Sequence, residues 1–374
     1  MVSRFAKGSF ALAHLLFDFS VPGTENGGLS IRWDGALWRP ARTRKMTSRT
    51  SVSTQTDTIR KDRIRAAFYH GHALTLDNPA YVLALRGFAD ELLRQDTSLG
   101  DVTVEALGIG DRKCAAEIRA KEAGVAAGVS EGQWLYDRAG LATSRGVNDG
   151  DVVAAGDALL RAEGNARILL SLERLVVNVM QRMSGIATAT RKLAEAIARQ
   201  SPNAHVVATR KTPWGLLDRR AVHVGRGGTH RLSLGDAILI KTNHLLLAAG
   251  SALRIEDAIR RAWANRKTAA FFEVEVTSVE EALLAARTLH DLQATDNSCP
   301  CILMLDNFSP AQAAAAMAAL RERDLHDAVL VEASGNVAES SLAAYAAAGV
   351  DVISIGALTH SPRALDLSAG LIPG

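Results

Sequence analysis

The second half of the chain alternates short apolar runs with Ala-rich amphipathic segments, and this repeat limits the fold more than any other feature. The runs recur at intervals of roughly 22 to 34 residues, which is the length of one strand and one helix. Strands that alternate with helices form parallel βα units, whose strands are buried on both faces and are therefore almost entirely apolar. We expect strands at 205–210, 237–241, 271–276, 301–305, 328–331 and 350–355, with helices at 256–266, 279–289, 310–323 and 339–348.

Nearly every predicted strand ends in a residue that a hydrophobic core disfavours. These residues are Arg210 and Lys211, Lys241, Glu275, Asp306, Ser334 and Gly356. In a (β/α) barrel the C-terminal ends of the strands converge on one mouth, where the active sites of that fold lie. A doubly wound open sheet is the alternative, and it would spread the same residues along an edge. The pattern favours a barrel with a functional mouth.

The region before this repeat predicts a different architecture. Asn78 and Pro79 are typical of an N-cap and a first helical turn, so we expect a helix through about Gln95. Its predicted buried face consists of Leu83, Leu85, Phe88, Leu92 and Leu93. Short alternating stretches between residues 101 and 164 predict a small antiparallel sheet, and helical periodicity returns over residues 165–186.

The first 65 residues differ in composition from the rest. They contain 12 Lys and Arg residues but 5 acidic residues, with no sustained apolar period after Phe19. We interpret residues 1–75 as a basic, disordered extension, or as sequence upstream of a true start near Met46. An organellar transit peptide is the alternative. Folded chain is expected to begin near Asn78.

The overall composition predicts a folded protein with a sizeable core. The chain is 48% hydrophobic and 22% charged, and no run approaches the roughly 18 apolar residues of a membrane-spanning helix. Its three cysteines, Cys114, Cys299 and Cys301, are too few for a disulfide framework or a structural zinc site. We therefore expect a soluble protein of the reducing cytoplasm, without a membrane partner.

Positive charge is concentrated between residues 174 and 244. This segment has 12 Lys and Arg residues and 3 acidic residues, although the net charge of the chain is only +3. Arg191, Lys192 and Arg199 have helical spacing and are interpreted as a solvated helix face. The cations expected to face the barrel mouth are Arg210, Lys211, Arg231 and Lys241. Such a cluster predicts binding of carboxylates or phosphates.

Two other uses of these cations remain open. A nucleic-acid groove would need aromatic side chains for base stacking, but aromatic residues make up 5% of the chain and only Trp214 lies among the cations. Lys241 is also a candidate Schiff-base lysine of an aldolase-like barrel.

Hydrogen-bond acceptors and glycine turns follow the later strands. Glu273 and Glu275 lie on one face of their strand, where they would bind ribose hydroxyls or, with Asp306, a divalent metal; a structural buried ion pair is the alternative. The turns at Ser334-Gly335-Asn336 and at Gly356 would present backbone N–H groups to a phosphate. Cations, carboxylates and turns together predict a polyanionic substrate that meets a phosphosugar.

These residues belong to an ordered series of motifs between Leu99 and Leu367. The motifs are Glu173-Arg174, Gln181 to Thr188, Thr209 to Thr212, Gly227 to Arg231, Ile240 to His244, Glu273 to Val276, Leu305 to Phe308 and Ile355 to His360. The series resembles the quinolinate phosphoribosyltransferase family, also called carboxylating nicotinate-nucleotide pyrophosphorylases. The resemblance implies conversion of quinolinate and phosphoribosyl pyrophosphate, with Mg²⁺, into nicotinate mononucleotide, pyrophosphate and CO2.

The resemblance also implies an α/β architecture in two domains. An N-terminal α/β sandwich domain at 76–190 is followed by an incomplete TIM-like (β/α) barrel at 191–374, and the C-terminal segment packs back on the sandwich domain. The expected assembly is a homodimer or a higher homo-oligomer.

Carried over motif by motif, the resemblance implies a role for each site residue. Arg174 would reach quinolinate from the neighbouring subunit. The two carboxylates of quinolinate would be held by Arg210, Lys211, His230, Arg231 and Lys241. Glu275 and Asp306 would engage the ribose and Mg²⁺, and Ser334, Gly335 and Gly356 the 5′-phosphate. The catalytic candidates are Lys211, Lys241, Glu275 and Asp306.

Several positions depart from the usual pattern of the family. The segment from Thr212 to Arg220 is shorter than usual and lacks a Pro-Gly pair and a Lys-Tyr pair. The replacements elsewhere are Ala208, Arg226, Thr242 and Asn336. These changes keep open another acceptor, such as nicotinate or a pyrimidine-like ring, and a relationship to the molybdenum-operon members of the family.

Overall fold

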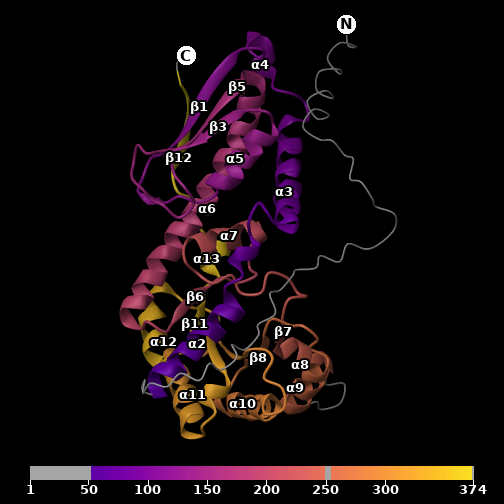
Figure 1. Ribbon diagram of the computed structural model, residues 1–374, viewed down its shortest axis with the longest axis vertical. Helices are drawn as coiled ribbons and strands as arrows, with labels where there is room; N and C mark the ends of the chain where they lie inside the picture. Colours follow the sequence, from indigo (N-terminus) through magenta and orange to yellow (C-terminus); the bar gives the residue numbers. More distant parts are fainter. Residues whose placement is uncertain (1–51, 249–253, 373–374) are drawn as a thin grey trace, which may run out of the picture.

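The computed structural model of the protein describes residues 52–248 and 254–372. These residues form an upper part built on an antiparallel sheet and a lower part built on a parallel sheet, and one long helix, α6 (Ala166–Gln200), runs through both (Figure 1). The mixed α/β architecture agrees with the predicted fold class. Helix α6 passes through residue 190, where the sequence predicts a domain boundary.

In the upper part, four of the described strands form an antiparallel sheet in the order β12-β1-β5-β3, and β2 and β4 form a separate antiparallel pair. The elements are α3 (Pro79–Thr97), α4 (Val102–Leu107), β1 (Lys113–Ala120), β2 (Gly124–Val125), α5 (Val129–Arg138), β3 (Ala142–Arg145), β4 (Val152–Val153), β5 (Ala158–Asn165) and β12 (Leu367–Ile372). Strand β12 comes from the far end of the chain and pairs with β1, so the C-terminal segment lies on the sheet of the upper part. Helix α5 was not predicted.

Helix α3 forms where the sequence predicts it, because the Asn78 side chain accepts a hydrogen bond from the Ala80 N–H and Pro79 occupies the first turn. Its predicted buried face is only partly correct. Leu85 and Leu93 are buried, whereas the Leu83 side chain is exposed. The stripe that packs inward repeats every four residues and consists of Tyr81, Leu85, Ala89 and Leu93.

In the lower part, the described residues form a parallel sheet with the strand order β6-β11-β10-β9-β8-β7. Its strands are β6 (His205–Val207), β7 (Ile238–Ile240), β8 (Phe272–Val276), β9 (Cys301–Asp306), β10 (Leu330–Ser334) and β11 (Val352–Ser354). Each predicted apolar run therefore overlaps a strand, although β10 begins two residues later than predicted and extends to Ser334. Strands β7 to β11 lie side by side in chain order, without the reversal of order that defines a doubly wound sheet, so that alternative is wrong. The barrel is incomplete because β6 and β7 lie at opposite edges of the sheet and are not paired.

Helices surround this sheet on its outer side (Figure 1). They are α7 (Leu216–Val224), α8 (Thr242–Ala248), α9 (Ile255–Ala264), α10 (Val279–Gln293), α11 (Pro310–Glu322), α12 (Leu342–Ala348) and α13 (Ala357–His360), with 3₁₀ turns at Gly71–Ala73, His326–Ala328 and Glu339–Ser341. The sequence determines several of their starts: Ser309 and Gln312 form a capping box at α11, and Ser278 caps α10.

Helix α2 (Val52–Phe68) lies in the lower part and corrects one expectation. The predicted basic extension of residues 1–75 is wrong from residue 52 onward, because Ile64, Ala67 and Phe68 are fully buried against residues of the parallel strands. The high Arg content of this helix hides a short apolar stripe with helical spacing. Residues 1–51, including the proposed start near Met46, lie outside the described residues.

Among residues 52–248 and 254–372, no helix combines the length and the hydropathy that crossing a bilayer requires.

The ion pair that fastens α2 to the barrel gives a first prediction. Arg60 binds both carboxylate oxygens of Asp351 at 2.5 and 2.6 Å, and Asp351 is almost fully buried. Arg60→Ala should lower the free energy of unfolding by about 3 kcal/mol, because it leaves a buried carboxylate without its cation. Urea unfolding followed by circular dichroism measures the change. Arg94→Ala, which removes an exposed pair with Glu91, is the control and should have no measurable effect; equal effects of the two variants would contradict the prediction.

Candidate active site

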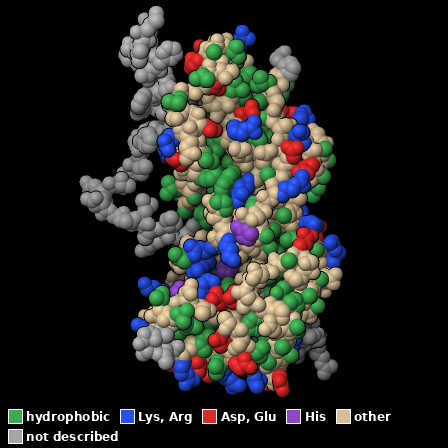
Figure 2. All heavy atoms as spheres, turned by 180° about the vertical axis from the view of Figure 1, so that it is seen from behind, with side chains coloured by type: hydrophobic (Ala, Val, Ile, Leu, Met, Phe, Trp, Pro, Cys, Tyr) green, Lys and Arg blue, Asp and Glu red, His purple; other side chains and the backbone are tan. Residues whose placement is uncertain are grey.

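A cavity of about 470 Å³ lies at the C-terminal ends of the parallel strands. This volume falls in the range of small-molecule binding sites. Its walls come from β7, β9, β10 and β11 and from the loops after β6 and before β7. The lining residues are Thr209, Arg210, Lys211, His230, Arg231, Leu239, Lys241, Met304, Asp306, Asn307, Glu332, Ser334, Gly335, Asn336 and Ser354. On the face drawn in Figure 2, Lys, Arg and His side chains gather near the middle of the molecule.

The fold brings most of the predicted site residues to this cavity. Those that line it are Arg210, Lys211, His230, Arg231, Lys241, Asp306, Ser334 and Gly335. Glu275 lies behind Lys241, and the Lys211 side chain passes Gly356, where a Cβ would stand 3.4 Å from Lys211 Cδ. Arg174 is different: its side chain lies on α6, is largely exposed, and contacts Glu173 at 3.7 Å.

Lys241 and Glu275 form an ion pair across the edge of the cavity. The Lys241 Nζ lies 2.7 Å from Glu275 Oε2, while Glu275 Oε1 accepts hydrogen bonds from the backbone N–H and the hydroxyl of Thr242. Burial opposes ionisation of Glu275, but these hydrogen bonds outweigh it and hold the pKa of the carboxyl below its usual range. A Schiff base requires a lysine nitrogen that is free to attack a carbonyl, whereas the Lys241 Nζ is engaged by Glu275, so the pair disfavours the aldolase-like alternative.

A divalent metal would find oxygen donors at the same side of the cavity. Asp306 lines the cavity, and its Oδ2 accepts a hydrogen bond from the Asn307 side chain at 2.9 Å. Carboxylate oxygens are the donors that Mg²⁺ prefers. Asp306 fits this role as it stands, whereas Glu275 would have to release Lys241 or Thr242 before it could bind a metal.

Helix α7 holds the two loops that carry cavity cations, the loop with Lys211 and the loop with Arg231. Asp218 on α7 binds Arg182 of α6 through two hydrogen bonds of 2.8 Å and accepts a third from the Thr212 hydroxyl, which lies next to Lys211. The neighbouring Arg219 donates to the backbone carbonyl of Arg231. Burial, and then the charge of Arg210, lower the pKa of Arg219 to about 10. The loops are thus fixed by buried charges on one helix.

The segment after Thr212 packs against the upper part of the molecule. The Trp214 ring lies 4.5 Å from the Phe88 ring of α3, and the Arg182 guanidinium lies 5.0 Å from the Trp214 ring. A further hydrogen bond of 2.9 Å joins the Thr359 hydroxyl to the Lys211 carbonyl. The loop is therefore anchored at both ends, by the hydrogen bond to the Lys211 carbonyl and by the ring contacts of Trp214.

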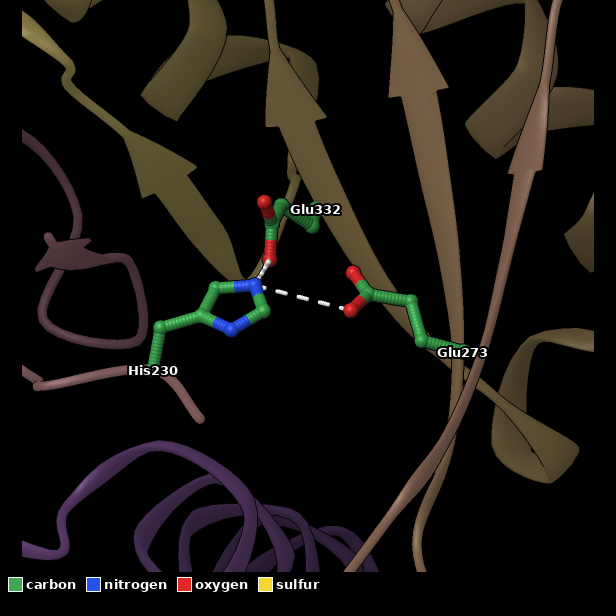
Figure 3. Close-up of side chains that lie close together, drawn as sticks. All are labelled: His230, Glu273 and Glu332. Carbon is green, nitrogen blue, oxygen red and sulfur yellow. Dashed lines mark ion pairs between the residues drawn. The ribbon is translucent and has the colours of Figure 1, made fainter. Parts of the chain in front are cut away.

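His230, Glu273 and Glu332 meet at the base of the cavity (Figure 3). The His230 Nε2 lies 3.5 Å from Glu273 and 3.4 Å from Glu332, and both carboxylates are fully buried. Burial, followed by the like charge of Glu332, raises the pKa of Glu273 well above its usual range. Glu332 also accepts a hydrogen bond from the Ser354 hydroxyl.

The separations in this cluster would suit a metal ion, but the hydrogen bonding of His230 does not. Its Nδ1 accepts the backbone N–H of Arg231 at 2.8 Å, which assigns the ring proton to Nε2, facing the two carboxylates. A metal-bound histidine instead donates through its second nitrogen. We therefore interpret the cluster as an electrostatic support, in which the His230 Nε2 faces two buried carboxylates without a hydrogen bond to either. Both nitrogens of His230 face protein groups, which differs from the carboxylate-binding role that the resemblance implies.

Several lining residues were missed by sequence reasoning. Glu332 was missed because the predicted strand stopped at Val331. Had the prediction extended the strand to Ser334, it would have shown a carboxylate within a buried strand. Leu239 and Met304 supply apolar walls, and no sequence signal separates them from ordinary core residues.

Comparison with known proteins matches this architecture over most of the chain. The model of the quinolinate phosphoribosyl transferase N-terminal domain matches residues 101–184, and the model of the C-terminal domain matches residues 186–369. A probable carboxylating nicotinate-nucleotide pyrophosphorylase of Archaeoglobus fulgidus is 39% identical over 271 residues, covering 72% of this chain and 97% of that protein. The chain belongs to the quinolinate phosphoribosyltransferase family.

Other members of the family share the sequence and the fold. A probable carboxylating nicotinate-nucleotide pyrophosphorylase of Methanothermobacter thermautotrophicus is 36% identical and covers 74% of this chain and 95% of its own length. The crystal structure of NadC from Streptococcus pyogenes superimposes with a TM-score of 0.67 and 31% identity, over 78% of this chain and 97% of that one. The two domain models of the quinolinate phosphoribosyltransferase family meet within helix α6.

The Lys241–Glu275 pair predicts a pH-dependent stability for this family member. A lowered folded-state pKa stabilises the protein above the pKa of the unfolded carboxyl, and the contribution is lost as the pH falls through the folded-state value. Burial raises the pKa of Glu275, and the hydrogen bond from Lys241 is the strongest interaction that lowers it. Lys241→Ala removes this hydrogen bond, so the pKa of Glu275 should then rise. Urea midpoints should separate wild type and variant more at pH 7 than at pH 3. A separation that does not change with pH would refute this account of the pair.

Proposed function

We propose that this protein transfers the phosphoribosyl group of phosphoribosyl pyrophosphate to quinolinate and removes one carboxyl group, forming nicotinate mononucleotide, pyrophosphate and CO2. The observation that carries the proposal is the gathering of Arg210, Lys211, Arg231 and Lys241 in one cavity beside a glycine turn. Two polyanions bound together would neutralise this charge. The names of the A. fulgidus and M. thermautotrophicus relatives describe the same reaction class.

The acceptor would bind through its two carboxylates. Burial, and then the charge of Arg210, lower the pKa of Arg231. The Arg231 Nε also has no hydrogen-bond partner among the described residues. An anion bound here would offset the free-energy cost of the buried charge and would accept a hydrogen bond from this nitrogen. Leu239 and Met304 would flank the planar ring. His230 would support Arg231 rather than bind the acceptor through a ring nitrogen.

The donor phosphate would occupy the turn after β10. Gly335 and Asn336 have φ angles of 88° and 50°, so the strand ends in a consecutive left-handed pair, a tight turn whose backbone N–H groups would bind the phosphate. A Cβ at Gly335 would stand 2.3 Å from Asn307 Oδ1, so glycine is required there. Gly356, beside Lys211, would complete the phosphate site.

The reaction needs no side-chain nucleophile. The ring nitrogen forms a bond to C1′ as the bond from C1′ to pyrophosphate breaks, and the carboxyl group beside that nitrogen then leaves as CO2, its electron pair passing to the positively charged ring before a proton replaces it. Mg²⁺, when bound, would neutralise the departing pyrophosphate. Asp306 and Glu275 would hold it, while Lys211 and Lys241 fix the two substrates, so catalysis would consist of positioning and electrostatics.

The proposal includes a homodimer or a larger homo-oligomer in the cytoplasm. Arg174 does not line the cavity of its own chain, which supports its delivery to the site of a neighbouring subunit. No nucleic-acid or membrane partner is part of the proposal. The cytoplasmic location is a proposal for this chain alone, since the name of a relative from Nicotiana tabacum describes that relative as mitochondrial.

The proposed reaction is tested by supplying quinolinate or nicotinate with phosphoribosyl pyrophosphate and Mg²⁺. Equal amounts of pyrophosphate and CO2 are expected from quinolinate. Pyrophosphate without CO2 from nicotinate alone would assign the other acceptor, and the absence of both products from a folded protein would overturn the proposal. Borohydride trapping of a carbonyl compound on Lys241 would support the Schiff-base alternative, and salt-sensitive DNA binding that survives Glu275→Ala would support a nucleic-acid groove.

Because the proposed active site takes residues from two subunits, two inactive variants should complement each other in a mixed dimer. Arg174→Ala and Lys241→Ala should each be nearly inactive as homodimers. Coexpression of the two variants should restore about a quarter of the wild-type activity, because about half of the dimers are mixed and each of these has one intact site. Differently tagged chains allow the mixed dimers to be isolated and assayed. If Arg174 serves its own subunit, the mixed dimers will be as inactive as the parents.

A further inference from the structure

Helix α2 lies outside residues 101–184 and 186–369, which the family models match, yet it reaches the base of the cavity. The helix is fastened far from that point. Arg60 binds Asp351 and the carbonyls of His326 and Val329, while Arg63 binds the carbonyls of Asp327 and Ala328 at 2.7 and 2.9 Å. These contacts fix the position of the helix relative to β10 and β11.

The last residue of α2 occupies the opening between the edge strands β6 and β7. Phe68 is fully buried in a cluster made with Val207, Phe271 and other residues of the parallel strands. Gly228, on the loop that carries His230, forms a parallel bridge with Val207 of β6. The end of α2 and this loop therefore fill the space that a closed barrel would give to strand pairing.

One backbone carbonyl joins α2 to the loop. The Phe68 carbonyl accepts hydrogen bonds from the Thr229 N–H at 2.6 Å, the His230 N–H at 3.2 Å and the Thr229 hydroxyl at 3.2 Å. The His70 N–H in turn donates to the Thr229 hydroxyl at 3.0 Å. The backbone position of His230 thus depends on Phe68.

The ring of Phe68 also restrains the side chain of His230. The imidazole packs edge-on between Phe68 and Phe271, with ring centroids 5.4 and 5.5 Å away. His230 has a φ angle of 55°, a left-handed conformation that costs free energy for a residue with a Cβ and persists only where surrounding contacts impose it. The Phe68 carbonyl and the two phenyl rings provide these contacts.

His230 passes this restraint to a cavity cation. Its Nδ1 accepts the backbone N–H of Arg231 at 2.8 Å, and the Arg231 side chain is held by the Ala237 carbonyl at 3.2 Å. The imidazole thus holds the backbone of Arg231, whose side chain lines the cavity.

We infer that Phe68 is a positioning residue of this enzyme, which acts through His230 to aim Arg231 at a carboxylate of the acceptor. The inference rests on the proposed function, because that function assigns Arg231 to the acceptor. It gives α2, a helix outside the matched family domains, a part in substrate binding.

The test compares two substitutions in the same helix of the full chain. Phe68→Leu removes the ring contact with His230 but keeps the backbone carbonyl, whereas Ile64→Val trims the same buried cluster without touching His230. We expect Phe68→Leu to raise the KM for the acceptor about tenfold, since a small displacement of a binding group is costly, and to leave the KM for the phosphoribosyl donor and kcat within about twofold. Ile64→Val should change neither KM. Thermal unfolding of both variants shows how far each is destabilised.

A second substitution removes the other phenyl ring that packs against the imidazole of His230. Phe271→Leu should raise the acceptor KM in the same direction as Phe68→Leu, and Phe68→Met serves if Phe68→Leu does not fold. The inference is overturned if Phe68→Leu leaves the acceptor KM unchanged, or if Ile64→Val raises it equally, which would indicate general loosening of the helix. An inactive wild type overturns the proposed function and with it the assignment of Arg231; an active wild type with unaltered variants overturns this inference alone.

Discussion

The structure depends on holding several positive charges together at the mouth of an incomplete barrel. Arg210, Lys211, Arg231 and Lys241 line one cavity, where their like charges repel one another. The protein meets this cost with carboxylates placed behind the cations. Glu275 binds Lys241 from outside the cavity, and Asp218 binds the loop that carries Lys211 through Thr212. The cavity itself keeps a positive charge, which is the property a site for two anionic substrates needs.

The supports of these cations come from distant parts of the chain. Helix α6 supplies Arg182, α7 supplies Asp218 and Arg219, and α13 supplies the Thr359 hydroxyl that holds the Lys211 carbonyl. Helix α2 reaches the base of the cavity, where Phe68 contacts His230. The parallel sheet makes this convergence possible, because all its strands end on one side and its open edge leaves room for a helix end and a loop.

Sequence reasoning located the strands well and the supports poorly. Runs such as 271–276 and 301–305 are apolar because both faces of their strands are buried, so periodicity and length identified them. Helix α2 was missed because arginines surround its apolar stripe, and these arginines find their partners in Asp351 and in carbonyls more than 260 residues away. Glu332 was missed because the predicted strand stopped at Val331, and its partners, His230 and Ser354, lie on other elements.

The sequence by itself determined the repeated βα units, the polar residue at the end of each strand and the excess of cations between residues 174 and 244, because these follow from local periodicity and composition. The resemblance of its motifs also led to the correct family. Only the tertiary structure decided which polar groups meet: that Glu275 binds Lys241, that His230 rests between two carboxylates and two phenyl rings, and that Phe68 holds its backbone. The physical reason is that pairing of buried charges and hydrogen-bonding groups depends on distances of a few ångströms between elements, which the order of residues along the chain does not specify.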